Sequence, residues 1–138
     1  MRVLLDTNIV VDILSKREGY EESLQILKYC EIGKLNGFVS VITVTDVHYI
    51  LRKHISPDDM REALQTLLLI VDIADVMKSD VSAAFTSNMK DFEDALQSAC
   101  AKRIKADYIV TRNMKHFEES DVKALLPVQA IKILNANS

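Results

Sequence analysis

Four oxygen-bearing side chains occupy similar places in the chain, where an apolar run gives way to a polar turn or a helical pattern. Asp6 follows the first apolar run, Asp46 lies shortly after the second, and Asn113 follows the run at residues 108–110. Asp94 stands in the first turn of a predicted helix that leads into that last run. Carboxylate and amide oxygens are the ligands that Mg²⁺ and Mn²⁺ prefer. The pattern therefore predicts a site for a divalent cation, provided that the fold brings the four side chains together.

The charge of such a cluster favours the same interpretation. Carboxylates that converge repel one another, and without a cation one or more of them would take up a proton. A hard divalent ion removes that cost. The sequence has no paired His or Cys and no HExxH spacing to indicate zinc, and it has no Gly-rich phosphate-binding loop. Its serines and 2 cysteines show no local signature of a nucleophile.

Helix capping is an alternative role for each acid taken singly. Asp6 can cap a first helix. Thr43 and Asp46 have the spacing of a variant capping box, and Asp91 and Asp94 repeat it. Capping requires no convergence between different helices, however. Four such groups predicted at one edge of a sheet therefore favour a site over four separate caps.

The elements that must position these groups alternate along the chain. Apolar runs short enough to be strands occupy residues 3–5, 38–42, 70–74 and 108–110, with a candidate fifth at residues 128–133. Segments with helical spacing separate them. Strands that alternate with helices indicate a parallel sheet, because a helical crossover is the natural link between parallel strands. We therefore expect an α/β domain of three layers, with its ligands at the carboxyl ends of 4–5 strands.

Helical spacing is clearest in five segments. They lie at residues 9–14, 24–30, 47–54, 63–68 and 95–103. The segment at residues 64–71 is unusually apolar. Burial in the core is the default expectation for it, and a dimer face is the functional alternative, because exposed apolar patches mark interfaces.

Composition bounds the class of protein. A chain of 138 residues fits one domain spanning residues 1–138. With 3 Gly and 2 Pro it has few turn residues for an all-β fold. The formal net charge of −3 argues against bulk cationic attraction to nucleic acid. We expect a cytoplasmic protein with no membrane span and no secretory signal, in which Cys30 and Cys100 are reduced packing residues.

Four motifs, in their order and separations, resemble the PIN domain family over nearly the whole chain. They are LLDTN at residues 4–8, SVITV at residues 40–44 leading to Asp46, DFEDALQ at residues 91–97 and ADYIVTRN at residues 106–113. The resemblance implies a Rossmann-like parallel sheet with helices on both faces and a Mg²⁺- or Mn²⁺-dependent ribonuclease acting on single-stranded RNA. Small stand-alone PIN domains of this length include toxins of bacterial toxin–antitoxin pairs, and they are commonly dimeric.

Carried over residue by residue, the resemblance makes Asp6, Asp46 and Asp94 the catalytic acids and the metal ligands, joined by Asn113. Asp46 stands where the family usually has Glu, which is one methylene longer. Asn113 stands where many members have a fourth Asp, so it keeps an oxygen donor and loses a charge. We expect Asp6 and Asp94 to hold the principal ion, and water activated by the metal to hydrolyse the phosphodiester bond. The expected products carry a 5′-phosphate and a 3′-hydroxyl.

Three further residues are expected to serve the substrate. Asn8 and Thr111 match family positions that hold the site together or meet the RNA. Arg112 follows the strand at residues 108–110 directly and is the best placed phosphate-binding residue. The expected partners are single-stranded RNA, a second copy of the chain in a homodimer and, as a candidate, an antitoxin protein.

Three alternatives remain open at this point. A haloacid-dehalogenase-like phosphatase also has an Asp after its first strand, but it needs a second Asp two residues on, where this chain has Asn8. A response-regulator receiver clusters its acids as a pair after the first strand, whereas Asp12 lies a helix away and is expected to be exposed. The third alternative is a catalytically weakened PIN-like module with Asn113 that binds RNA or a partner without cutting.

Overall fold

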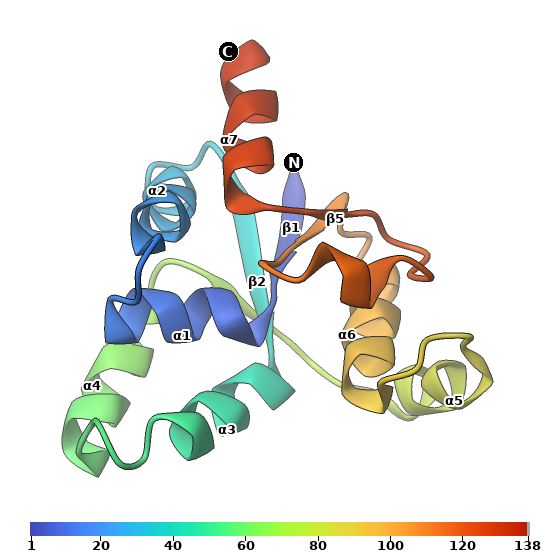
Figure 1. Cartoon of the computed structure of the whole chain (residues 1–138), viewed down its shortest axis with the longest axis horizontal. Coiled ribbons are helices and arrows are strands. Elements are labelled where there is room, and N and C mark those ends of the chain that lie inside the picture. The colour runs from blue at the N-terminus through green and yellow to red at the C-terminus, as the bar shows by residue number, and fades with distance from the viewer. Residues whose placement is uncertain (138) are drawn as a thin grey trace.

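The computed structural model describes residues 1–137, which fold around one parallel sheet (Figure 1). Five strands lie in the order β3-β2-β1-β4-β5, and every neighbouring pair is parallel. The strands are β1 (Arg2–Leu5), β2 (Asn36–Ser40), β3 (Asp72–Ala74), β4 (Tyr108–Val110) and β5 (Ala124–Leu125). The prediction of an α/β fold with 4–5 parallel strands is confirmed.

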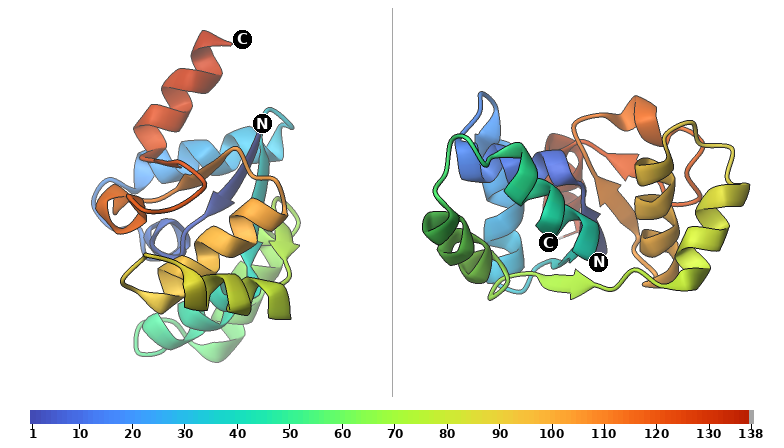
Figure 2. Two further views of the ribbon diagram at one scale, coloured as in Figure 1. Left: turned by 90° about the vertical axis from the view of Figure 1, so that its right-hand side faces the viewer. Right: turned by 90° about the horizontal axis from the view of Figure 1, so that it is seen from below.

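Helices cover both faces of this sheet (Figure 2). Helices α1 to α4 and α7 share one core cluster with the sheet, whereas α6 packs in a second cluster and α5 lies against α6. The helices are α1 (Thr7–Ser15), α2 (Tyr20–Glu31), α3 (Val41–Ile50), α4 (Pro57–Leu67), α5 (Lys78–Thr86), α6 (Phe92–Arg103), the short 3₁₀ helix η1 (Met114–Phe117) and α7 (Pro127–Ala136). The three predicted layers are therefore present.

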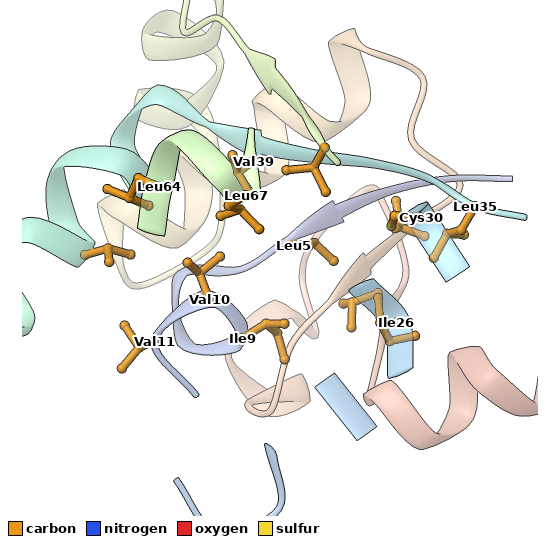
Figure 3. Close-up of a cluster of buried hydrophobic side chains, with 14 of the residues drawn as sticks. Leu5, Ile9, Val10, Val11, Ile26, Cys30, Leu35, Val39, Leu64 and Leu67 are labelled. Carbon is orange, nitrogen blue, oxygen red and sulfur yellow. The ribbon is translucent and has the colours of Figure 1, made fainter. Parts of the chain in front are cut away.

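The central strand explains why both faces are apolar. Successive side chains of a strand point to opposite faces. In β1, Val3 and Leu5 belong to the core cluster under α1 and α2, and Leu4 belongs to the cluster under α6. All three are fully buried. Figure 3 labels Leu5 of β1 and Ile9 of α1 among the side chains of the first cluster.

Three features of the observed elements differ from the sequence prediction. Residues 128–133, the candidate fifth strand, lie in α7, and β5 is the shorter segment before it. Pro127 occupies the first turn of α7, and the Gln129 side chain accepts a hydrogen bond from the Leu126 N–H (2.8 Å), which fixes a helix start there. The second strand ends at Ser40 instead of continuing through residue 42. Helix α5 was not predicted at all.

The apolar segment at residues 64–71 is mainly core. Leu64, Leu67 and Val71 are buried, in agreement with the default expectation, while Leu69 is 87% exposed. Cys30 and Cys100 are both buried and free, as expected for packing residues. Across residues 1–137, no helix has both the length and the apolar character needed to cross a membrane.

Candidate metal and substrate site

The carboxylate of Asp6 sits where β1 ends and α1 begins. Its backbone N–H donates to the carbonyl of Val110 in β4 (2.9 Å), which ties the two strand ends together. As the N-cap of α1, Asp6 accepts a hydrogen bond at Oδ1 from the Thr7 N–H (2.9 Å). At Oδ2 it accepts from the Thr111 hydroxyl (2.8 Å) and the Asn8 amide (3.1 Å). Burial raises the pKa of Asp6, and these hydrogen bonds oppose that rise without cancelling it.

Asn8 and Thr111 connect the loops after β1 and β4. The Asn8 amide donates to Thr111 Oγ1 (3.3 Å) and accepts from the Arg112 N–H (3.3 Å). Thr111 also accepts from the Asn113 N–H (3.0 Å), and its side chain is fully buried. These contacts place Thr111 behind Asp6, where it orients the carboxylate, and they place Asn8 at the edge of the cavity described below.

A chain of buried polar side chains joins three helices beneath the site. The hydroxyls of Thr7 in α1 and Thr43 in α3 lie 2.9 Å apart, and Gln97 of α6 donates to Thr43 (3.0 Å). Thr43 is not the N-cap of its helix, because Ser40 caps α3 by accepting from the Thr43 N–H (3.3 Å). The capping interpretation was therefore wrong for Thr43, which instead fixes α3 against α1 and α6.

Asp46 projects from the second turn of α3 and meets Glu93 of α6. Both side chains line the same cavity. A hydrogen bond to Asp46 raises the pKa of Glu93 to about 8, assisted by burial and by the negative charges of Asp46, Asp91 and Asp94. A hydrogen bond between two carboxyl groups needs one of them protonated, so the pair holds a proton near neutral pH.

Asp94 lies in the first turn of α6. Asp91 is the N-cap of that helix and accepts from the Asp94 N–H (2.9 Å), as the spacing predicted. Burial raises the pKa of Asp94 to about 6, together with the negative charges of Asp91 and Asp6, while His116 acts in the opposite direction. His116 Nδ1 lies 3.6 Å from Asp94 Oδ2.

These acids surround one cavity of about 220 Å³. The predicted residues that line it are Asp6, Asn8, Asp46, Asp94 and Asn113. Glu93, Arg17 and His116 also line it. A larger cavity of about 930 Å³ adjoins it, sharing Asp94 and His116. The fold thus brings together the four predicted metal ligands, which come from the loops after β1 and β4 and from helices α3 and α6.

The donor set suits a hard divalent cation in its chemistry. Asp6, Asp46, Glu93 and Asp94 all offer carboxylate oxygens. Burial raises the pKa of Asp6, and burial together with neighbouring acids raises the pKa of Asp94. The hydrogen bond to Asp46, burial and neighbouring acids raise the pKa of Glu93. Within residues 1–137, however, no three Asp, Glu, His or Cys side chains are already arranged to hold a metal ion. A cation bound there would favour loss of the proton that the Asp46–Glu93 pair holds.

Arg112 does not line this cavity. Its Nε lies 2.5 Å from Oδ2 of Asp12, which projects from α1. Asp12 has no exposed surface, so the expectation of an exposed helix residue was wrong. The Arg112 side chain remains 43% exposed, and its guanidinium is held at the edge of the site by this ion pair.

The family of the chain follows from comparison with known proteins. The profile of the PIN domain family matches residues 2–115. The chain belongs to the PIN domain family. This membership confirms the resemblance drawn from the four motifs and decides against the receiver and haloacid-dehalogenase alternatives. No protein of curated function matched the chain in sequence.

Solved structures place the fold among toxins of toxin–antitoxin pairs. VapBC2 from Rickettsia felis, bound to a DNA fragment from its promoter, gives a TM-score of 0.74 at 18% identity, covering 91% of this chain and 98% of that one. FitAcB from Neisseria gonorrhoeae gives 0.69 at 18% identity over 91% and 98% of the two chains. VapC20 from Mycobacterium tuberculosis, a toxin that cleaves the sarcin-ricin loop, gives 0.62 at 11% identity over 78% and 86%. At these identities the likeness concerns the fold.

The sequence interpretation missed four contributors to the site. Glu93 adjoins Asp94 in the chain. Its position suggested only the general preference of acidic residues for the first turn of a helix. Gln97 lies one turn further along α6, and nothing local distinguishes it from a surface residue. Asp12 and Arg17 follow the first strand closely, but their roles depend on contacts made in the folded chain. The place of Glu93 in the first turn of a predicted helix, directly beside Asp94, is the one sequence signal that indicates it.

Proposed function

We propose that this PIN domain is a ribonuclease that depends on Mg²⁺ or Mn²⁺ and cuts single-stranded RNA. The observation that carries the proposal is the convergence of Asp6, Asp46, Glu93 and Asp94 on one cavity. Burial there raises the pKa values of Asp6 and Asp94, and the hydrogen bond to Asp46 together with burial raises that of Glu93. A bound cation would oppose these shifts. The description of VapC20 as a toxin that cleaves the sarcin-ricin loop supports ribonuclease chemistry in this fold. We treat residues 1–138 as a single nuclease domain.

The residues of the chain have distinct roles in this proposal. Asp6 and Asp94 would hold the principal cation, Asp46 would bind it directly or through water, and Asn113 would offer a neutral oxygen. When bound, the cation supplies activation of a water molecule and neutralises charge that develops on the phosphate. The hydrogen bonds from Thr111 and Asn8 keep the Asp6 carboxylate in one orientation.

The substrate must be gripped by local cations, because the chain as a whole carries a formal net charge of −3. Arg112, anchored through Nε, can present the rest of its guanidinium to an RNA phosphate. The adjoining cavity of about 930 Å³ includes Lys90 and Lys115 and offers room for the strand on either side of the scissile bond. Asn8, at the edge of the smaller cavity, is placed to meet the RNA as well as to hold Asp6.

Cleavage of labelled single-stranded RNA in Mn²⁺ tests the proposal. Wild type should cut, Asp6→Asn should lose nearly all activity, and EDTA should abolish cleavage. Asp72→Asn is the matched control, because Asp72 is an exposed acid at the start of β3 and does not line the cavity. Equal cleavage by wild type and Asp6→Asn would remove Asp6 from the reaction and overturn the proposed mechanism.

A non-cutting module that binds RNA or a partner is the second candidate. The hydrogen-bonded carboxyl pair of Asp46 and Glu93 and the neutral Asn113 favour it, because both reduce the charge available to a cation. Calorimetry distinguishes the two functions. A nuclease should bind Mn²⁺ and lose that binding in Asp94→Asn, whereas the module should bind little Mn²⁺ and tolerate the substitution.

We also propose an antitoxin partner and a homodimer. VapBC2, FitAcB and a toxin–antitoxin complex from Klebsiella pneumoniae, which gives a TM-score of 0.69 at 22% identity over 91% and 97% of the two chains, support the antitoxin. The ring pair of Phe85 and Phe92, with centroids 5.0 Å apart and exposures of 74% and 43%, is an apolar surface of the kind that partners cover. Light scattering after size-exclusion chromatography measures the homodimer, and co-expression with the product of a neighbouring gene tests the antitoxin.

A further inference from the structure

Asp12 is a buried charge that the proposed reaction does not use. Its side chain is 0% exposed, and an unpaired carboxylate in such a place is costly. Two arginines from different loops approach it. Arg112 contributes the ion pair at Nε, and Arg17 donates its backbone N–H to the Asp12 carbonyl (3.3 Å) while its guanidinium acts on the carboxylate through space. The buried acid of α1 thus pairs with Arg112, while Arg17 follows just past the end of the helix.

Arg17 stands at the rim of the acidic cavity. Helix α1 ends at Ser15, its C-cap Lys16 has a φ of 52° that turns the chain sharply, and Arg17 follows that turn. Arg17 lines the same cavity as Asp6, Asp46 and Asp94. Among the lining residues within the described chain, it alone is a lysine or arginine. It is exposed, so its guanidinium is open to a ligand.

Arg17 places a positive charge at the rim of a cavity whose other ionisable lining groups are acids and His116. An arginine presents donors in a fork that fits two oxygens of a phosphate. Water that is activated among the acids must attack a phosphate held close by, and the neighbouring phosphates of the strand then lie along the rim.

We infer that Arg17, which lines the rim of the acidic cavity, binds a backbone phosphate of the RNA strand next to the one that is cut. The inference rests on the proposed ribonuclease function and adds a substrate-binding residue to it. Asp12 acts as a positioning residue for Arg112, because it is buried and its carboxylate pairs with the Arg112 guanidinium.

The salt dependence of RNA binding tests the role of Arg17. The measurement uses a fluorescein-labelled single-stranded RNA of mixed sequence, Mn²⁺ and the non-cutting Asp6→Asn protein as parent. Adding Arg17→Gln should weaken binding about tenfold at low salt, as expected for a charge-assisted contact. It should also reduce the slope of log K against log[salt] by about 0.7, the change expected for one phosphate contact to a single strand. Adding Arg17→Lys should keep the slope.

Arg61→Gln is the matched control. Arg61 is an exposed arginine of α4 that does not line the cavity, so its loss changes the net charge equally and should leave the slope near that of the parent. A double-mutant cycle then tests Asp12. Asp12→Asn should weaken RNA binding in the parent and have a smaller effect when Arg112→Gln is already present, because Arg112 is the arginine that Asp12 contacts. A purely structural role for Asp12 would lower stability equally in both backgrounds without this coupling.

The outcomes separate the inference from the proposed function. If Arg17→Gln and Arg61→Gln bind RNA with the same affinity and slope, Arg17 does not contact a phosphate, and the ribonuclease proposal stands unchanged. If Arg17→Gln alters the affinity for Mn²⁺ but leaves the salt dependence of RNA binding unchanged, Arg17 interacts with the acidic side chains of the cavity and does not contact the RNA. If the parent protein does not bind single-stranded RNA at all, both are overturned.

Discussion

Replacing Asp94 with Asn should stabilise the metal-free protein at neutral pH. Burial and the charges of Asp91 and Asp6 raise the pKa of Asp94 from 3.8 to about 6. A carboxyl whose pKa is higher in the folded state binds its proton more tightly there. Stability is then greatest below the unfolded pKa and falls as the pH rises through the folded pKa. Asn resembles the neutral carboxyl group and carries no charge, so the variant should not lose this stability as the pH rises.

The size of the expected stabilisation follows from the shift in the pKa of Asp94. About two pKa units at 1.36 kcal/mol each correspond to roughly 3 kcal/mol if the shift is taken in full. Part of the carboxyl still meets water and is screened by it, so we expect about 1–2 kcal/mol. For a chain of this length that raises Tm by roughly 3–8 °C at pH 7.5 in EDTA. At pH 4 the advantage should vanish, because Asp94 is then protonated in the folded protein.

Added Mn²⁺ should reverse the order of stability. A cation that binds the folded wild type at about 100 times its dissociation constant contributes about 2.7 kcal/mol, and Asp94→Asn should lose most of this gain. Urea denaturation in EDTA and in Mn²⁺ measures both states, with Asp72→Asn as the control that should follow wild type. The reasoning is refuted if Asp94→Asn is less stable than wild type in EDTA at pH 7.5, or if Mn²⁺ stabilises both proteins equally.

Three further expectations concern the sheet and the site. Gly37→Ala should lower the free energy of unfolding by about 1–3 kcal/mol in urea denaturation, because the added Cβ would lie 2.7 Å from Cys30 Sγ in a packed core. Thr111→Val removes the hydroxyl that donates to Asp6 and should cost about 1–3 kcal/mol while weakening Mn²⁺ binding, both measurable by calorimetry. Mn²⁺ binding at pH 7 should release a proton from Glu93, seen as a binding enthalpy that depends on the buffer, and Glu93→Gln should reduce that dependence.

The central sheet could be predicted because its strands are short, apolar and separated by helical patterns. The errors lie where local pattern is ambiguous. Residues 128–133 are apolar enough for a strand or a helix, and the start of α7 is decided by Pro127 and by Gln129 bonding back to Leu126. Helix α5 buries Asp80 and Ala84 and therefore has no apolar stripe to reveal it. It is fixed by the contact of Asp80 with Arg103 of α6 (3.0 Å), which no local pattern encodes.

The site residues that could be predicted from the sequence are those that lie close to the strands in the chain. Asp6 and Asn113 adjoin β1 and β4, and Asp94 begins the helix that precedes β4. The role of Glu93 was missed because it depends on a hydrogen bond with Asp46, which belongs to another helix. The burial of Asp12 likewise depends on an arginine from the far end of the chain, and an isolated helical pattern gives no sign of that partner.

Capping and metal binding were set against each other as interpretations of the acids, yet the structure shows that they are compatible. Asp6 caps α1 with one carboxylate oxygen and faces Thr111 and Asn8 with the other. In α6 the two tasks fall to different residues, because Asp91 accepts the backbone hydrogen bond and leaves the Asp94 side chain to the cavity. Removing Asp91 should therefore weaken the start of α6 and disturb Asp94 indirectly, whereas removing Asp94 should spare the helix. A carboxylate at a helix start is thus oriented by the same backbone amide that favours its negative charge, and that orientation suits it to a cation site.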